Sequence, residues 1–95
     1  MKIKFSYRAK KEFIDSAKFY EGRVAGLGKR FKREIRKRVD LIQNHPKLAE
    51  LKYGDVRVLV VKSFPFTIHY KIEKEYIVIV AIFHTSQNPD KLRSI

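Results

Sequence analysis

The sequence contains no cysteine. Disulfide bonds and thiolate metal sites are therefore excluded, which agrees with a reducing cytoplasmic location. Long apolar runs are also missing. The longest, from Tyr76 to Phe83, is far shorter than the ~20 residues of a membrane-spanning helix, and the first residues lack the apolar segment of a signal peptide. We therefore expect a soluble, cytoplasmic protein that does not enter a membrane.

Acidic residues are scarce. The 95 residues include 22 Lys and Arg against 10 Asp and Glu, which gives a formal net charge of +12. A chain of this length forms one domain, spanning residues 1–95. So large a charge on one small domain predicts a polyanionic partner, such as nucleic acid, an acidic protein segment or an anionic membrane surface. The alternative is a basic protein without such a partner.

Three runs of β-branched and aromatic residues dominate the C-terminal half: Val56–Val61, Phe66–Ile72 and Tyr76–His84. Such runs favour strands. Only three or four residues separate consecutive runs, whereas a parallel crossover needs a dozen or more. The sequence therefore predicts a three-stranded antiparallel meander. His69 alternates with apolar neighbours in the middle strand, on the face opposite Ile68 and Tyr70.

The N-terminal half predicts a short strand and two helices. Ile3, Phe5 and Tyr7 alternate with polar residues, as in a strand with one buried face. Apolar residues then recur at helical spacing over Ala9–Val24, with Ser6 as a cap, and over Leu27–Asn44. A glycine-rich turn joins the two helices into an αα-hairpin, and residues 47–55 are expected to form a loop.

The order is β-α-α-β-β-β, which is an α+β fold: an N-terminal strand, an αα-hairpin and a three-stranded antiparallel meander, with the helices packed on one sheet face. The other sheet face has no predicted cover. After His84 the pattern fades into a loop, and residues 90–95 are expected to form a tail or a frayed helical turn. An uncovered, partly apolar face next to a large positive charge favours a partner-binding surface.

The second helix concentrates positive charge on its polar face. The simplest interpretation of this charge is that the face is exposed to solvent. Its basic residues are Lys29, Arg30, Lys32, Arg33, Arg36, Lys37 and Arg38.

No strong catalytic motif is present. The sequence contains neither a phosphate-binding loop nor a zinc-binding helix. His69 and His84 can converge on neighbouring strands, but no carboxylate accompanies them, so neither a metal nor another cofactor is expected. Ser63 and Ser86 have no matching Asp and His for a hydrolytic triad.

Metal-independent RNA cleavage remains chemically possible, because a base and several cations are its only requirements. For each candidate residue, the alternative to a catalytic role is that it is an ordinary surface charge or a half-buried strand histidine. The candidates near one sheet edge are Arg57, Lys62, His69, His84, Lys91 and Arg93.

Several segments, taken in order, resemble the RelE/ParE superfamily of toxins from type II toxin–antitoxin systems. The family's first helix resembles Ala9–Tyr20, and the start of its second helix resembles Gly26-Leu27-Gly28 with Phe31. The remaining segments are Pro46 after that helix, Arg57 at the first meander strand, Phe64–Tyr70 (Phe-Pro-Phe-Thr-Ile-His-Tyr), and the closing segment Ile79–Pro89. The resemblance covers nearly the whole chain.

The functional residues of the mRNA-cleaving branch distinguish the two branches of the superfamily. The mRNA-cleaving RelE branch uses a cation at the first meander strand, two further arginines and a C-terminal tyrosine. Arg57 supplies the first group, but Thr67 and Gln87 occupy the two arginine positions, and no tyrosine follows Tyr76. The resemblance therefore implies the ParE branch, which poisons DNA gyrase without obvious catalytic residues of its own.

Three functions follow as hypotheses. The first is a ParE-like toxin that inhibits growth through DNA gyrase and is neutralised by an acidic antitoxin, in a heterotetramer or larger assembly. The second is a RelE-like mRNA interferase acting on the ribosome, with Arg57, His69, His84 and Arg93 as candidate catalytic groups. The third is a non-catalytic nucleic-acid-binding module. The expected target- or antitoxin-binding residues are Arg33, Arg36, Arg57, Lys62, His69, His84, Gln87, Lys91 and Arg93.

Overall fold

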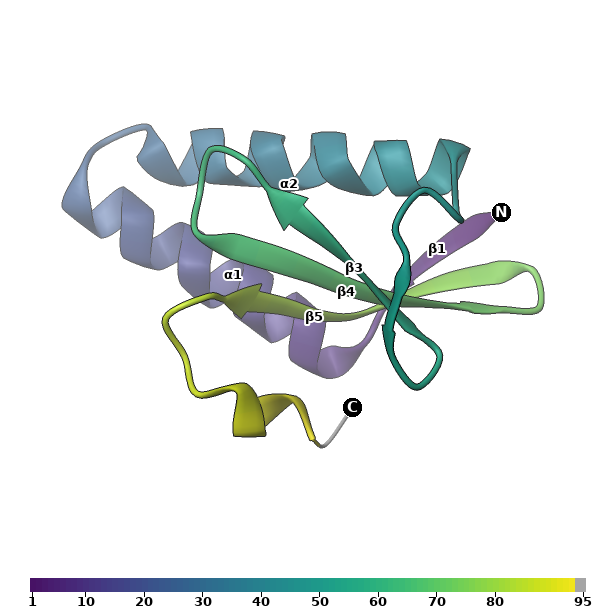
Figure 1. Ribbon diagram of the computed structural model, residues 1–95. Helices are drawn as coiled ribbons and strands as arrows, with labels where there is room; N and C mark the ends of the chain where they lie inside the picture. The colour runs from purple at the N-terminus through teal and green to yellow at the C-terminus, as the bar shows by residue number, and fades with distance from the viewer. Residues whose placement is uncertain (94–95) are drawn as a thin grey trace.

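A two-helix hairpin packs against a five-stranded mixed sheet (Figure 1) in the computed structural model, which describes residues 1–93. The elements are β1 (Lys2–Phe5), α1 (Tyr7–Arg23), α2 (Leu27–Asn44), β2 (Leu51–Tyr53), β3 (Val56–Val61), β4 (Phe66–Glu73), β5 (Tyr76–His84) and the 3₁₀ helix η1 (Pro89–Leu92). The strand order is β1-β5-β4-β3-β2. Among the strand pairs of residues 1–93, only β1–β5 is parallel.

The predicted α+β class is confirmed, but the three-stranded meander is incomplete. Residues 51–53, predicted as loop, form β2 on the outer side of β3, and β1 pairs with β5 at the other edge. Tyr7 is also not a strand residue. It begins α1 and is 83% exposed, because the Ser6 hydroxyl accepts a hydrogen bond from the Ala9 backbone N–H at 3.0 Å and starts the helix there.

The core lies between the helix hairpin and one face of the sheet. α2 contributes its buried stripe of Phe31, Ile35, Val39 and Ile42, and the meander contributes Ile68, Tyr70, Ile77, Ile79 and Ile82. An aromatic cluster joins the layers: the ring centroids of Phe31 and Phe66 are 4.9 Å apart, and those of Tyr20 and Phe64 are 5.0 Å apart. The helical spacing seen in the sequence is therefore the spacing of core contacts.

The turn between the helices is fixed by Glu21. Its carboxylate accepts hydrogen bonds from the backbone N–H groups of Gly26 and Gly28 at about 3 Å, which satisfies two donors at the start of α2. These hydrogen bonds lower the pKa of Glu21 below its usual value. Gly26 has φ +86°, a left-handed conformation that glycine adopts at little cost.

Gly28→Ala should destabilise the protein, because a Cβ there would lie 2.6 Å from the Ala17 carbonyl oxygen and 2.9 Å from the Glu21 Cβ. The two helices would have to separate, at a cost of about 1–3 kcal/mol in the free energy of unfolding. Gly22→Ala is the matched control, since nothing lies within 4 Å of its Cβ position. Urea denaturation of both variants tests this, and equal stabilities would contradict the close helix packing.

The second sheet face is covered more fully than the sequence predicts. Its central residues His69 and Phe83 are only 3% and 5% exposed. The ring of Tyr53, from the unpredicted strand β2, lies against His69 with centroids 5.8 Å apart. Val60, which pairs with Thr67 on this face, is still 62% exposed. The expectation of an uncovered face is therefore wrong at its centre.

Candidate functional site

His69 is a buried structural residue of the second sheet face. Its Nδ1 lies 2.7 Å from the Tyr53 hydroxyl, and its Nε2 lies 2.7 Å from the Thr67 hydroxyl. Burial, with a smaller contribution from the nearby Arg8 cation, lowers the pKa of His69 to about 4. The imidazole is therefore neutral at pH 7, with both nitrogens already hydrogen-bonded.

Stability should fall as the pH is lowered from about 6.5 to about 4. The unfolded chain protonates His69 near pH 6.5, whereas the folded protein does so near pH 4. The unfolded state therefore binds more protons between these values, and roughly 2–3 kcal/mol of unfolding free energy is lost across this window. Urea denaturation from pH 7 to 4 measures it. His69→Gln should flatten the slope, and an unchanged slope in that variant would contradict the assignment.

Arg57 lies on the helix side of the sheet, opposite the face that carries His69. It pairs with Tyr70 across β3 and β4, while His69 pairs with Val58. The Arg57 guanidinium donates a hydrogen bond to the Ala49 carbonyl oxygen at 2.7 Å, and the Tyr70 hydroxyl donates to the Pro46 carbonyl oxygen at 2.8 Å. Both side chains thus hold the segment that follows α2.

His84 lies at the other end of the helix-side face. It pairs with Phe66, four residues along β4 from Tyr70, which corresponds to roughly 13 Å at the rise of a strand. The Ser86 backbone N–H donates to His84 Nδ1 at 3.1 Å, so the proton of the neutral ring lies on Nε2. His84 also lines a small pocket of about 320 Å³ with Phe19 and Tyr20 of α1. His69 and His84 therefore lie on opposite faces and do not converge.

The C-terminal segment brings three other candidates together. Lys91 Nζ donates to the Gln87 side-chain oxygen at 3.3 Å, and Arg93 forms an ion pair with Asp90 at 3.5 Å. Arg8 of α1, which the sequence does not single out, donates to the Lys91 carbonyl oxygen at 2.6 Å. Arg8 also pairs with Glu12, and the Glu12 carboxylate accepts from the Ile82 backbone N–H at 2.9 Å. α1 thereby ties the C-terminal segment to the edge of β5.

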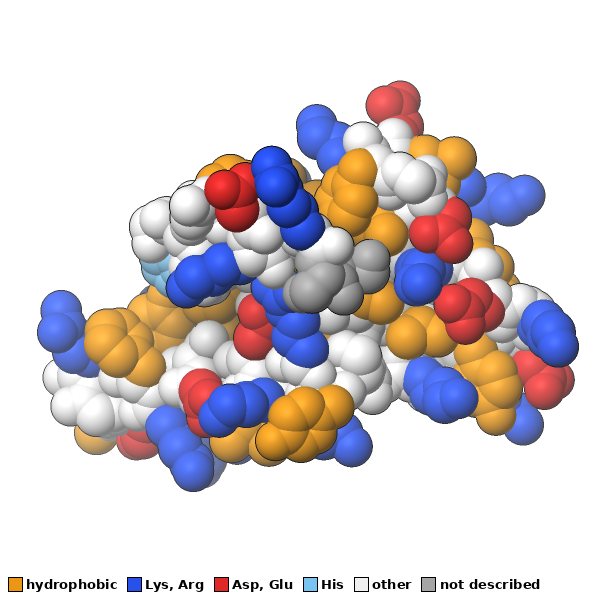
Figure 2. Space-filling model, turned by 90° about the horizontal axis from the view of Figure 1, so that it is seen from below, with side chains coloured by type: hydrophobic (Ala, Val, Ile, Leu, Met, Phe, Trp, Pro, Cys, Tyr) orange, Lys and Arg blue, Asp and Glu red, His pale blue; other side chains and the backbone are white. Residues whose placement is uncertain are grey.

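The remaining candidates are surface cations on other elements. Arg33 and Arg36 are exposed on α2, and Lys62 is exposed in the β3–β4 connection. Figure 2 views the side of the molecule on which α1 and the C-terminal segment lie, and it shows basic side chains scattered among apolar ones. The predicted site residues thus fall into separate groups, on α2, at the C-terminal segment and on both faces of the sheet.

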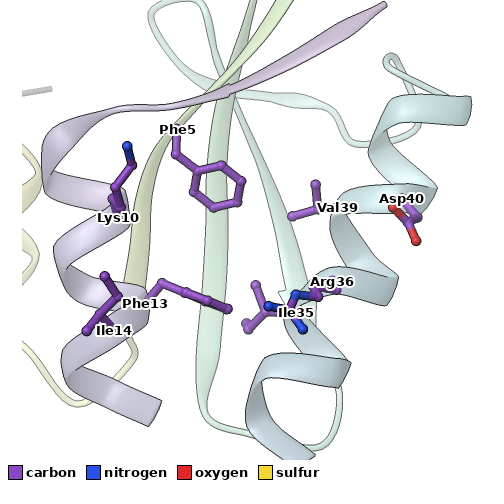
Figure 3. Close-up of a pocket in the computed structure, with 8 residues that line it drawn as sticks. All are labelled: Phe5, Lys10, Phe13, Ile14, Ile35, Arg36, Val39 and Asp40. Carbon is purple, nitrogen blue, oxygen red and sulfur yellow. The ribbon is translucent and has the colours of Figure 1, made fainter. Parts of the chain in front are cut away.

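A groove between α1 and α2 is a feature that the sequence does not predict. Its volume is about 440 Å³, and its rim carries Lys10, Arg36 and Asp40. Figure 3 shows Phe5, Phe13 and Val39 directed into the space between the two helices. The apolar residues that line it are Phe5, Phe13, Ile14, Ile35 and Val39. Ile14, which is 43% exposed, is the visible sequence signal, because it lies off the buried stripe of α1.

Within residues 1–93, no three His, Asp or Glu side chains gather in a way that can hold a metal ion. No helix in the same range is both long and apolar enough to cross a membrane.

The fold places this protein in a class of small α+β domains with a helix hairpin packed on a mixed sheet. A solved structure titled "Chromosomal ParDE TA system from P. aeruginosa" has a similar fold, with a TM-score of 0.76 and 18% sequence identity over 88% of this chain and 95% of that chain. No curated protein sequence matches the chain.

The family follows from the sequence match. Residues 3–89 match the family model described as "ParE toxin of type II toxin-antitoxin system, parDE". The chain belongs to this ParE toxin family. The predicted superfamily and the predicted ParE branch are therefore confirmed.

Proposed function

We propose that this protein inhibits growth by acting on DNA gyrase and that an acidic antitoxin neutralises it. The observation that carries the proposal is the family match over residues 3–89. The net charge of +12 supports the acidic character of the antitoxin, because opposite charge speeds association and favours complementary partners.

The α1–α2 groove is the proposed docking site for the antitoxin. Its walls are apolar, and its rim carries two cations, Lys10 and Arg36, and one acid, Asp40. An amphipathic helix fits such a groove by placing its apolar face inward, and acidic residues on its flanks would meet the two cations. We therefore propose an acidic amphipathic helical segment as the occupant.

The positions of the nuclease candidates favour gyrase over mRNA as the target. General base catalysis needs a base within hydrogen-bond reach of the substrate hydroxyl. His69 is buried with both ring nitrogens hydrogen-bonded, Arg57 is directed to the Ala49 carbonyl group, and His84 lies at the far end of the sheet. These groups do not form one site in the free protein.

Induction of the protein in bacteria separates the two targets. Inhibition of gyrase predicts growth arrest, broken DNA and induction of the DNA-damage response while mRNA stays intact. Primer extension on mRNA from the same cells provides the opposing readout, since cuts at codon-specific positions would overturn the proposal in favour of mRNA cleavage. Co-expression of a cognate antitoxin should restore growth.

A further inference from the structure

The polar face of α2 carries an unbalanced concentration of positive charge. The helix contains seven basic residues and two acidic ones, Glu34 and Asp40. Lys29, Arg33 and Lys37 recur every four residues, so they form a row with steps of about 6 Å along the helix axis. This row, with Arg30 on one flank, is named here the basic ridge; all four residues are exposed.

The basic ridge carries little compensating charge. Its one ion pair among the described residues joins Lys37 to Glu34 at 3.7 Å. The flanking residue Arg30 lies over the ring of Phe64, at 5.7 Å from the ring centroid. Like charges at this spacing disfavour the helix, so the ridge lowers the stability of the free protein.

The ridge differs from a protein-docking surface because it lacks apolar anchors. The large apolar residues that are exposed in residues 1–93 lie on other elements, including Tyr7, Ile14 and Phe19 of α1. Protein interfaces draw most of their energy from buried aromatic and apolar anchors. A face with cations and no anchors suits a partner whose charge lies on its outer surface, which is a nucleic-acid backbone.

We infer that the basic ridge of α2 binds the phosphate backbone of double-stranded DNA without reading its sequence. Duplex DNA carries one negative charge per roughly 1.7 Å of axis, so a straight row of cations can contact several phosphates at once. Single strands are usually held by stacking their bases on exposed aromatic rings, and α2 exposes no such ring. The inference is independent of the target proposed above.

Fluorescence anisotropy with a mixed-sequence 20-base-pair duplex, over a range of KCl concentrations, tests the inference. The ridge variant carries Lys29→Gln, Arg33→Gln and Lys37→Gln. The control variant carries Lys2→Gln, Lys52→Gln and Lys74→Gln, three exposed lysines outside α2, so both variants lose three charges. Each lost phosphate contact should reduce the slope of log K against log salt by roughly 0.9.

The expected result is a slope reduced by about 2 to 3 and at least tenfold weaker binding for the ridge variant, with the control variant close to wild type. A single strand of equal length should bind more weakly than the duplex. Equal losses in both variants would assign binding to net charge alone and overturn the inference. Wild-type affinity in the ridge variant, or a single strand bound as tightly as the duplex, would overturn it as well. Thermal melting of both variants confirms folding.

Discussion

Ile14→Glu in the α1–α2 groove should weaken antitoxin binding at least a hundredfold and abolish rescue of growth on co-expression. Ile14 is 43% exposed and lines the groove beside Phe13. The substitution removes an apolar anchor worth about 1.5–3 kcal/mol when buried, and it places a carboxylate against a partner that is proposed to be acidic. Calorimetric titration of the purified toxin with the antitoxin measures the loss.

Leu48→Glu is the matched control for this prediction. Leu48 is 45% exposed and lies in the segment after α2, outside the groove. The same change in charge and apolarity there should leave the affinity for the antitoxin within a few-fold of wild type. Undiminished binding by Ile14→Glu would exclude the groove as the docking site. Growth arrest by the same variant in the absence of antitoxin would still test the proposed inhibition of growth.

Arg57→Ala should abolish growth arrest, whereas Arg33→Ala and Arg36→Ala should leave it nearly unchanged. Arg57 is half-buried and directed by its 2.7 Å hydrogen bond to the Ala49 carbonyl oxygen. Loss of a hydrogen bond from a charged group costs about 1.5–3 kcal/mol. The two α2 arginines are exposed members of a redundant set, so removing one changes the surrounding field only slightly.

The comparison requires equal amounts of soluble, folded protein, checked by urea denaturation of each variant. Arg57→Gln then separates two roles, because glutamine keeps a donor for the Ala49 carbonyl oxygen without the charge. Growth arrest by Arg57→Gln but not by Arg57→Ala would assign Arg57 an anchoring role. Full toxicity of Arg57→Ala together with a harmless Arg33→Ala would instead place the toxic surface on α2.

The elements with strong local patterns could be predicted from the sequence. The bounds of α2 agree with the structure at both ends, because its buried stripe, the glycine before it and the His45-Pro46 pair after it are local signals. The strands β3 and β5 also agree at both ends, since β-branched residues fill them and short connections bound them. Ser6 caps α1 as predicted.

Features that depend on contacts between distant residues could not be predicted. β2 has three residues with no alternating pattern, and it forms only because β3 offers an edge for pairing. Both faces of β3 are rich in apolar residues, so the sequence does not indicate which face carries Arg57. The burial of His69 depends on Tyr53, which β2 brings against it.

The candidate site residues show the same difference between features encoded locally and features that depend on distant contacts. Basic residues and histidines could be identified by type, but their grouping depends on strand register and on the path of the C-terminal segment. Arg8 joins that segment to α1 across 83 positions of the chain, a contact that no local pattern encodes. The α1–α2 groove likewise exists only after the hairpin has packed on the sheet.

The most direct test of the proposed function is a supercoiling assay with purified gyrase, relaxed plasmid and ATP. Addition of the purified protein should inhibit supercoiling or accumulate cleaved plasmid, and preincubation with the antitoxin should prevent both effects. The Ile14→Glu variant should inhibit gyrase in the presence of the antitoxin as well as in its absence. Unchanged supercoiling at a large excess of folded wild-type protein would contradict gyrase as the target.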